Sequence, residues 1–231
     1  DGPFAEAEQL LKTDPLYSAV LTGSPLLKKN NSGEGSSSDD NDLPTPEELA
    51  NMLATCAYFN CENVELINAL LVKITSFHAR VLDPVVITRT MASCARLGFA
   101  NNEALLKLVG AAKYREVDFD GRTAARMIIA MGRFQFETTA VFRQMVQVLE
   151  REGVKNLTAK EAREVLYFLH ESPMPRNTKR RLITHLCSVI VRRWTQRKER
   201  VTAQDMNFTV EVSKQFGIEA PWLHEALFKI T

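Results

Sequence analysis

Basic side chains are concentrated in one stretch of this chain. Between Thr158 and Val201 there are 11 Lys and Arg residues against 4 Asp and Glu, although the whole 231-residue chain has a formal net charge of only +1. A favourable charge at a helix C-terminus explains one or two of these cations, and the remainder is suited to neutralising phosphates, because each phosphate contact releases counterions. An acidic protein partner and a solvated helix face are the alternatives.

The spacing of the apolar residues places these cations on one side of a helix. At about 100° per residue, Leu182, Leu186 and Ile190 share an apolar sector. Arg181 and Arg192 fall on the opposite side. We therefore predict an RNA-binding site made of nine residues: Arg176, Lys179, Arg180, Arg181, Arg192, Arg193, Arg197, Lys198 and Arg200.

Signatures of catalysis are absent from the sequence. It contains no GxxxxGK[ST], GxGxxG, GxSxG or HExxH motif. Its four histidines lie far apart, without a Cys or carboxylate at metal-ligand spacing. His170 precedes Glu171, but adjacent helical residues point in different directions, so we interpret this pair as a helix end. We predict a protein that is not an enzyme, with no cofactor, no metal and no small-molecule substrate.

Internal repeats indicate the elements that position the basic stretch. Segments that begin at Leu53, Met91 and Ile128 align with offsets of 38 and 37 residues. In each segment two apolar residues flank a single position, and a fourth such pair lies near the C-terminus: Phe59 and Cys61, Leu97 and Phe99, Phe134 and Phe136, and Phe216 and Ile218. Between the third and fourth pairs there is room for one more repeat, in which SPMP replaces the short turn.

Each repeat reads as a helix, a short turn and a second helix. One such hairpin cannot cover its own apolar face, so stacked copies are needed to bury a core. We predict an all-α fold, an α-solenoid of about five helix-turn-helix repeats of 37–40 residues, over residues 46–231. Thr45, Asp83 and Thr158 are the predicted helix N-caps, with Glu161 completing a capping box. An irregular helical bundle is the alternative.

The N-terminal part differs from the repeats. Residues 30–45 are rich in Ser, Gly and acidic residues, which predicts a flexible linker open to proteolysis. Residues 1–29 carry Leu10, Leu11, Leu16 and Tyr17, which predicts a segment that docks on a partner or on the repeats. No apolar run is long enough for a membrane span, and four cysteines without CxxC spacing indicate buried thiols in a reducing compartment.

The repeat signature, A-x-C-A-x-Φ-x-Φ with Φ apolar, resembles known organellar repeats. It is similar to heptatricopeptide and octotricopeptide repeats and to the helical repeats that accompany RAP domains and FAST-kinase-like proteins, over Pro46 to about Thr231. The resemblance implies mitochondrial or plastid RNA metabolism or an organellar ribosome. We expect a non-catalytic subunit of an RNA–protein assembly in the mitochondrial matrix, with a ribosome component that contacts rRNA beside neighbouring protein subunits as the favoured interpretation. A protein–protein scaffold in another large mitochondrial complex is the alternative.

Overall fold

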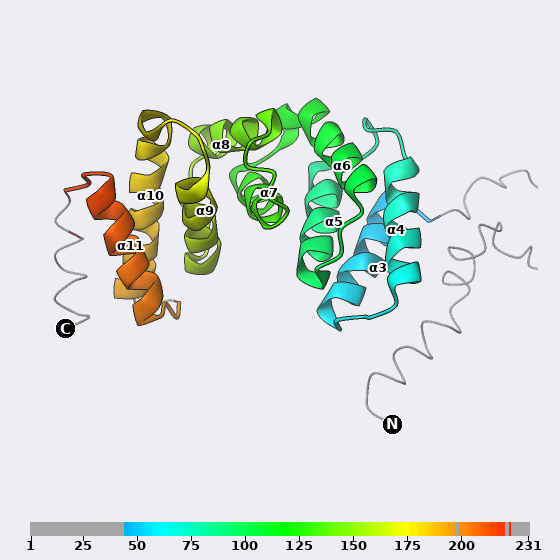
Figure 1. Cartoon of the computed structure of the whole chain (residues 1–231), viewed down its shortest axis with the longest axis horizontal. Helices are drawn as coiled ribbons and strands as arrows, with labels where there is room; N and C mark the ends of the chain where they lie inside the picture. Colours follow the sequence, from blue (N-terminus) through cyan, green and yellow to red (C-terminus); the bar gives the residue numbers. More distant parts are fainter. Residues whose placement is uncertain (1–43, 197–198, 220–221, 223–231) are drawn as a thin grey trace, which may run out of the picture. The chain divides into compact units, whose positions relative to one another are not determined.

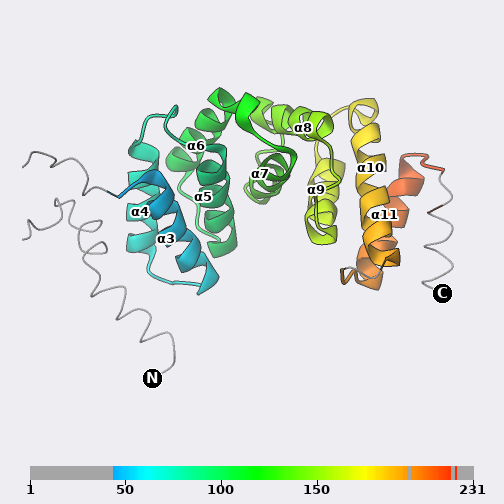
Figure 2. The same cartoon turned by 180° about the vertical axis from the view of Figure 1, so that it is seen from behind.

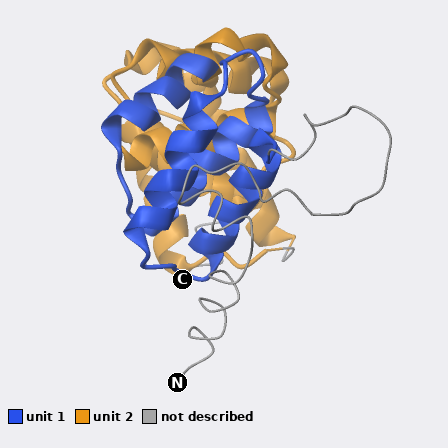
Figure 3. Cartoon of the chain, turned by 90° about the vertical axis from the view of Figure 1, so that its right-hand side faces the viewer, with its two compact units in different colours: residues 1–111 blue, residues 112–231 orange. Residues whose placement is uncertain are grey.

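The structure, a computed structural model, describes residues 44–196, 199–219 and 222. This part of the chain consists of nine α-helices and one 3-10 helix, without a strand, so the prediction of an all-α fold is confirmed. The chain divides into two compact units, residues 1–111 and 112–231 (Figure 3). The docking segment predicted for residues 1–29 and nearly all of the predicted linker lie outside the described residues.

The first compact unit is built from helical hairpins. Its helices are α3 (Pro46–Tyr58), α4 (Val64–Ser76), α5 (Pro84–Leu97) and α6 (Asn102–Tyr114), and the unit boundary falls within α6. α3 packs against both α4 and α5, as Figure 1 shows. Leu53 of α3, Leu70 of α4 and Met91 of α5 are fully buried in the resulting core. The first helices of two successive repeats therefore pack on each other, as the repeat pattern predicts.

The second compact unit continues the same scheme. It contains a 3-10 helix, η1 (Glu116–Asp118), followed by α7 (Gly121–Arg133), α8 (Ala140–Glu152), α9 (Ala159–Glu171), α10 (Arg176–Thr195) and α11 (Ala203–Gln215). The hairpin pairs α7–α8 and α9–α10 are in contact, and α10 also contacts α11 (Figure 2). The first helix α9 packs against α7 and touches α11. Hairpins and contacts between first helices are thus present inside each unit, while a continuous five-repeat solenoid stays a prediction.

The predicted N-caps are confirmed. The side chains of Thr45, Asp83 and Thr158 each accept a hydrogen bond from the first turn of the helix that follows. At α9 the capping box is complete, because Glu161 N donates to Thr158 Oγ1 at 3.1 Å and Thr158 N donates to Glu161 Oε2 at 3.0 Å.

The paired apolar residues mark a helix C-cap that recurs in four repeats. The residue between each pair has a left-handed φ: 50° at Asn60, 64° at Gly98, 59° at Gln135 and 59° at Gly217. The next N–H donates to the carbonyl five residues earlier, as Cys61 does to Cys56 at 2.9 Å and Phe99 to Cys94 at 3.0 Å. This six-to-one hydrogen bond defines the Schellman motif, which places an apolar residue directly after the left-handed one. The signature Φ-x-Φ therefore encodes the end of a helix.

Thiols are buried, as expected. Cys56, Cys94 and Cys187 are buried, Cys61 is half-buried, and none of the four forms a disulfide. Burial raises the pKa of the Cys94 thiol to about 12 and that of Cys187 to about 11. Burial, together with the neighbouring Cys61, raises the pKa of Cys56 to about 12. These three sulfurs stay protonated at neutral pH and pack as small apolar groups.

Glu161 should make part of the stability depend on pH. Burial acts to raise the pKa of its carboxyl, but the hydrogen bond from the Thr158 backbone and the interactions with Arg126 and Arg122 outweigh burial and hold the pKa below 4.5. A pKa lowered by folding contributes stability above its unfolded value, and this contribution is lost as the pH falls through the folded value. We expect Glu161→Gln to lower the free energy of unfolding by about 0.5–2 kcal/mol at neutral pH.

The difference in the free energy of unfolding between the wild type and Glu161→Gln should shrink as the pH falls from neutral through the lowered pKa of the folded Glu161 carboxyl, because protonation then makes both side chains uncharged. Urea unfolding at neutral pH and over a series of acidic pH values measures this difference. Glu65→Gln, in the exposed first turn of α4, is the control, with an expected change within about 0.5 kcal/mol. A difference that stays constant with pH would contradict the assignment of the stabilisation to the Glu161 carboxylate.

Candidate nucleic-acid interface

α10 presents two chemically distinct faces. Its apolar side is buried as the spacing predicts, with Leu182, Leu186 and Ile190 at 1% exposure or less. Arg181 and Arg192 are exposed on the opposite side. The twenty residues of α10 include no Asp or Glu, so the exposed side carries positive charge without an acidic residue of its own helix.

Four of the nine predicted phosphate contacts lie exposed on α10. Arg181 and Arg192 make no side-chain hydrogen bond or ion pair with any residue that the structure describes. Arg176 lies over the ring of Phe216, 5.1 Å from its centroid, and Arg180 Nη2 donates to the carbonyl of Gly217 at 3.0 Å. These last two contacts occupy only part of each guanidinium, which has five N–H donors. All four arginines can therefore still bind an anion.

Lys179 requires a correction. Its residue exposure is 6%, and its Nζ donates to the carbonyls of Leu169, His170 and Ser172 at 3.0, 2.8 and 2.8 Å. Burial lowers its pKa, while the charge of Glu171 opposes this shift. The three donors of the ammonium are matched by three carbonyls, so Lys179 is not an exposed phosphate contact.

The reason lies in how α9 ends. The other described first helices end with a left-handed residue whose neighbours donate back to the helix, but α9 is followed by Ser172 at φ −62° and then by Pro173. Proline has no N–H to donate. The carbonyls at the end of α9 therefore need another donor, and Lys179 supplies it from the first turn of α10. The SPMP stretch removes the N–H donors that would end α9, and the buried lysine replaces them.

The side chain of Arg193 is also bound within the protein. Its Nη2 lies 3.4 Å from the carbonyl oxygens of both Lys155 and Leu157, and its Nη1 lies 3.6 Å from Glu199 Oε1. The other oxygen of Glu199 accepts from the N–H of Ala159, at the start of α9, at 2.5 Å. Arg193 thus joins the end of α10 to the segment before α9. The prediction of Arg193 as a free phosphate contact is corrected accordingly.

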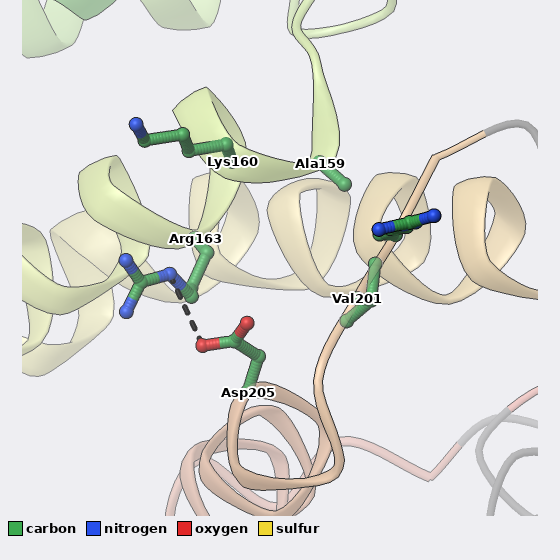
Figure 4. A pocket seen from close by; sticks show the side chains of 6 residues that line it. Ala159, Lys160, Arg163, Val201 and Asp205 are labelled. Carbon is green, nitrogen blue, oxygen red and sulfur yellow. Dashed lines mark ion pairs between the residues drawn. The ribbon is translucent and has the colours of Figure 1, made fainter.

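The last three predicted residues lie after α10. Arg197 and Lys198 fall outside the described residues. Arg200 is exposed and lines a cavity of about 190 Å³ with Lys160 and Arg163 of α9. Figure 4 shows Arg163 paired with Asp205, with Nε 3.2 Å from Oδ1, and Lys160 extending from the first turn of α9. Lys160 and Arg163 belong to the basic stretch but are not among the nine predicted residues, all of which lie between Arg176 and Arg200.

His170 and Glu171 are the last two residues of α9, so their interpretation as a helix end is confirmed. The Nδ1 atom of His170 lies 2.8 Å from Glu171 Oε1, however, so the expectation that these adjacent side chains point apart is wrong. The Nε2 atom of His170 lies 2.7 Å from Gln215 Oε1 on α11. Both ring nitrogens are thus engaged within the protein, where they join α9 to α11. Among the described residues no group of three or more His, Cys, Asp or Glu side chains is placed to hold a metal ion.

No protein-family model matches the sequence, and a search of curated proteins finds no match. Within the described part of the chain, the helices are too short or too polar to cross a membrane.

Proposed function

We propose that this protein is a non-catalytic helical-repeat subunit of an organellar RNA–protein assembly, a component of the mitochondrial ribosome that contacts rRNA through α10. The observation that carries the proposal is the exposed side of a twenty-residue helix that has no acidic residue and keeps Arg176, Arg180, Arg181 and Arg192 at the surface. Cations in this arrangement position a phosphate backbone without reading bases. The proposed role is therefore architectural.

The assignment to the mitochondrial matrix rests on the repeat signature and is supported by the thiols. Four free cysteines, three of them buried, are compatible with a reducing compartment. The partners proposed are rRNA and neighbouring protein subunits.

The test removes the four exposed charges of α10 together. Arg176, Arg180, Arg181 and Arg192 are each replaced by Gln, and the affinity for a single-stranded RNA of mixed sequence is measured by fluorescence anisotropy over a range of salt concentrations. Each lost phosphate contact should reduce the log–log salt slope by about 0.7, so the quadruple variant should lose about 3 units of slope if all four arginines bind phosphates. The loss should be similar across RNA sequences.

A matched control keeps the change in net charge the same. Lys73, Lys107, Lys113 and Arg143 are exposed cations on α4, α6 and α8, and their quadruple replacement by Gln should leave most of the affinity and slope intact. Equal losses in the two variants would mean that only net charge matters, which contradicts a site on α10. A wild-type chain that binds no RNA, alone or within its assembly, would overturn the proposal.

A protein scaffold is the second candidate, because apolar side chains are exposed around the end of α6. Val117 of η1 is 80% exposed and Tyr114 is 76% exposed. Large exposed apolar residues that lie close together favour a protein partner. In that case Tyr114→Ser with Val117→Ser should release a specific protein subunit from the purified assembly, and the α10 variant should leave the RNA content of the assembly unchanged.

A further inference from the structure

α7 carries a stripe of arginines that the basic stretch does not include. Arg122, Arg126 and Arg133 recur at intervals of four and seven residues, which places them on one side of the helix. Their side chains are 49%, 48% and 40% exposed. We call these three residues the α7 arginine stripe.

Two half-buried carboxylates on the neighbouring helix α9 hold the stripe. Glu161 Oε1 accepts from the Nε atoms of Arg122 and Arg126 at 3.3 and 2.9 Å. Glu164 Oε2 accepts from Arg133 Nη2 at 3.2 Å. The carboxylate side chains are only 14% and 15% exposed, so each acid lies beneath its arginines. Glu161 is further fixed by its second oxygen, which accepts from Thr158 in the capping box.

The anchoring contacts leave the outer donors of the stripe available. Arg122 and Arg126 bind Glu161 through Nε alone, and their Nη groups have no acceptor among the described residues. Arg133 uses one Nη group and keeps the other. The paired N–H donors of a guanidinium match two oxygens of a phosphate. Along the stripe two carboxylates of α9 contact three guanidinium groups. Asp120 at the start of α7 accepts from the Thr123 N–H at 2.7 Å, and its pKa is lowered by the hydrogen bonds from Thr123 and, to a smaller extent, by the charge of Arg122.

Stability alone is a weak reason for this arrangement. Ion pairs with exposed arginines contribute only about 0–1 kcal/mol each. Holding an arginine in place before a ligand arrives, in contrast, removes part of the entropy cost of binding, about 0.5–1.5 kcal/mol per side chain. Four and seven residues of helix correspond to about 6 and 10 Å along its axis. The stripe is therefore too long for a single phosphate and fits several phosphates along a strand.

We propose that Arg122, Arg126 and Arg133 form a second phosphate-binding surface, which contacts successive phosphates of an RNA strand through their outer N–H groups. This inference rests on the proposed function, because it extends RNA contact from α10 to a first helix of the repeats. Glu161 and Glu164 act as positioning residues, since they fix the guanidinium groups and do not touch the RNA.

Two triple variants test the proposal with a single-stranded RNA of mixed sequence. Replacing the three arginines by Gln should weaken RNA affinity at least about tenfold and reduce the log–log salt slope by about 2. Replacing them by Lys keeps the charge but removes the Nε contacts of Arg122 and Arg126, the Nη2 contact of Arg133 and the paired donors of all three. The Lys variant should keep nearly the wild-type slope and still bind about threefold to fivefold more weakly, because its cations are no longer held in position.

The control compares three variants: the α10 quadruple variant, the Gln variant of the stripe, and a variant that carries both sets of substitutions. Independent surfaces should give losses of affinity that add on a logarithmic scale. If the wild type and the stripe variants bind RNA equally while the α10 variant does not, this inference fails and the proposed function stands. If the wild type binds no RNA, both fail. A Lys variant that binds as the wild type does would overturn pre-organisation, and loss of only a protein subunit from the assembly would overturn RNA as the ligand.

Discussion

Replacing Lys179 by Met is expected to lower the free energy of unfolding of the second compact unit by about 2–4 kcal/mol. Methionine fills a similar volume but donates no hydrogen bond, so the carbonyls of Leu169, His170 and Ser172 lose the donor that the ammonium now provides. Leu169 and Ser172 are buried. The Leu169 carbonyl keeps the Ser172 hydroxyl as a donor at 2.7 Å, but the Ser172 carbonyl would be left without a donor, and a buried carbonyl without a partner costs about 1–3 kcal/mol. Urea unfolding followed by circular dichroism measures the loss.

Arg181→Met is the matched control for Lys179→Met. It removes a cation from the same helix, but Arg181 is exposed and has no side-chain partner among the described residues. We expect a change within about 0.5 kcal/mol. The two variants should therefore differ in which property they lose. Lys179→Met should lose stability, while Arg181→Met should lose RNA affinity and keep stability. Equal stability of the two variants would show that Lys179 does not cap α9.

Gly132→Ala in α7 is expected to destabilise the second compact unit by about 1–3 kcal/mol. A Cβ atom at Gly132 would overlap the ring of Phe168 on α9. The clash involves the Cγ, Cδ1 and Cδ2 atoms, so the whole ring has to move. Since Ala favours a helix over Gly by about 1 kcal/mol, a net loss of stability requires the overlap to outweigh that gain. Thermal unfolding of the full chain measures the result.

Gly110→Ala is a control for which the opposite effect on stability is expected. Gly110 lies in α6, and a Cβ at this position would meet no atom within 4 Å. Gly110→Ala should therefore stabilise by about 0.5–1 kcal/mol. Adding Phe168→Ala to Gly132→Ala should recover part of the loss, because the smaller side chain removes the overlap. If Gly132→Ala stabilises the chain as Gly110→Ala does, α7 and α9 are not in close contact at this point.

The repeat pattern could be predicted because its causes are local. The left-handed residue at Gly98 and the capping box of Thr158 and Glu161 are each specified within six residues of sequence, and local signals of this kind survive without an alignment. The buried face of α10 was predictable for the same reason. Periodicity predicts which side of a helix is apolar, and the rest of the helix then faces outward.

The roles of individual cations could not be predicted in the same way. Arg193 is engaged by carbonyls 36 and 38 residues away, and nothing in its neighbourhood in the sequence distinguishes it from Arg192. The role of Lys179 did have a signal in the sequence. The prolines after α9 remove the N–H donors that end the other first helices, so a nearby side chain has to supply a donor. The α7 stripe was missed because its carboxylates are on the next first helix, so the pattern becomes visible only when helices one repeat apart are compared.

The packing within each compact unit also bears on how the chain comes to fold. The helices that pack most extensively are neighbours or next neighbours along the chain, as in α7 with α8 and α9, and α9 with α10. Such low contact order allows folding on a timescale of milliseconds or faster. A hairpin can form as soon as its second helix has emerged during synthesis, and each new hairpin then meets a surface that is already in place. Folding would thus proceed vectorially from the N-terminal side of a unit, without waiting for the last helix.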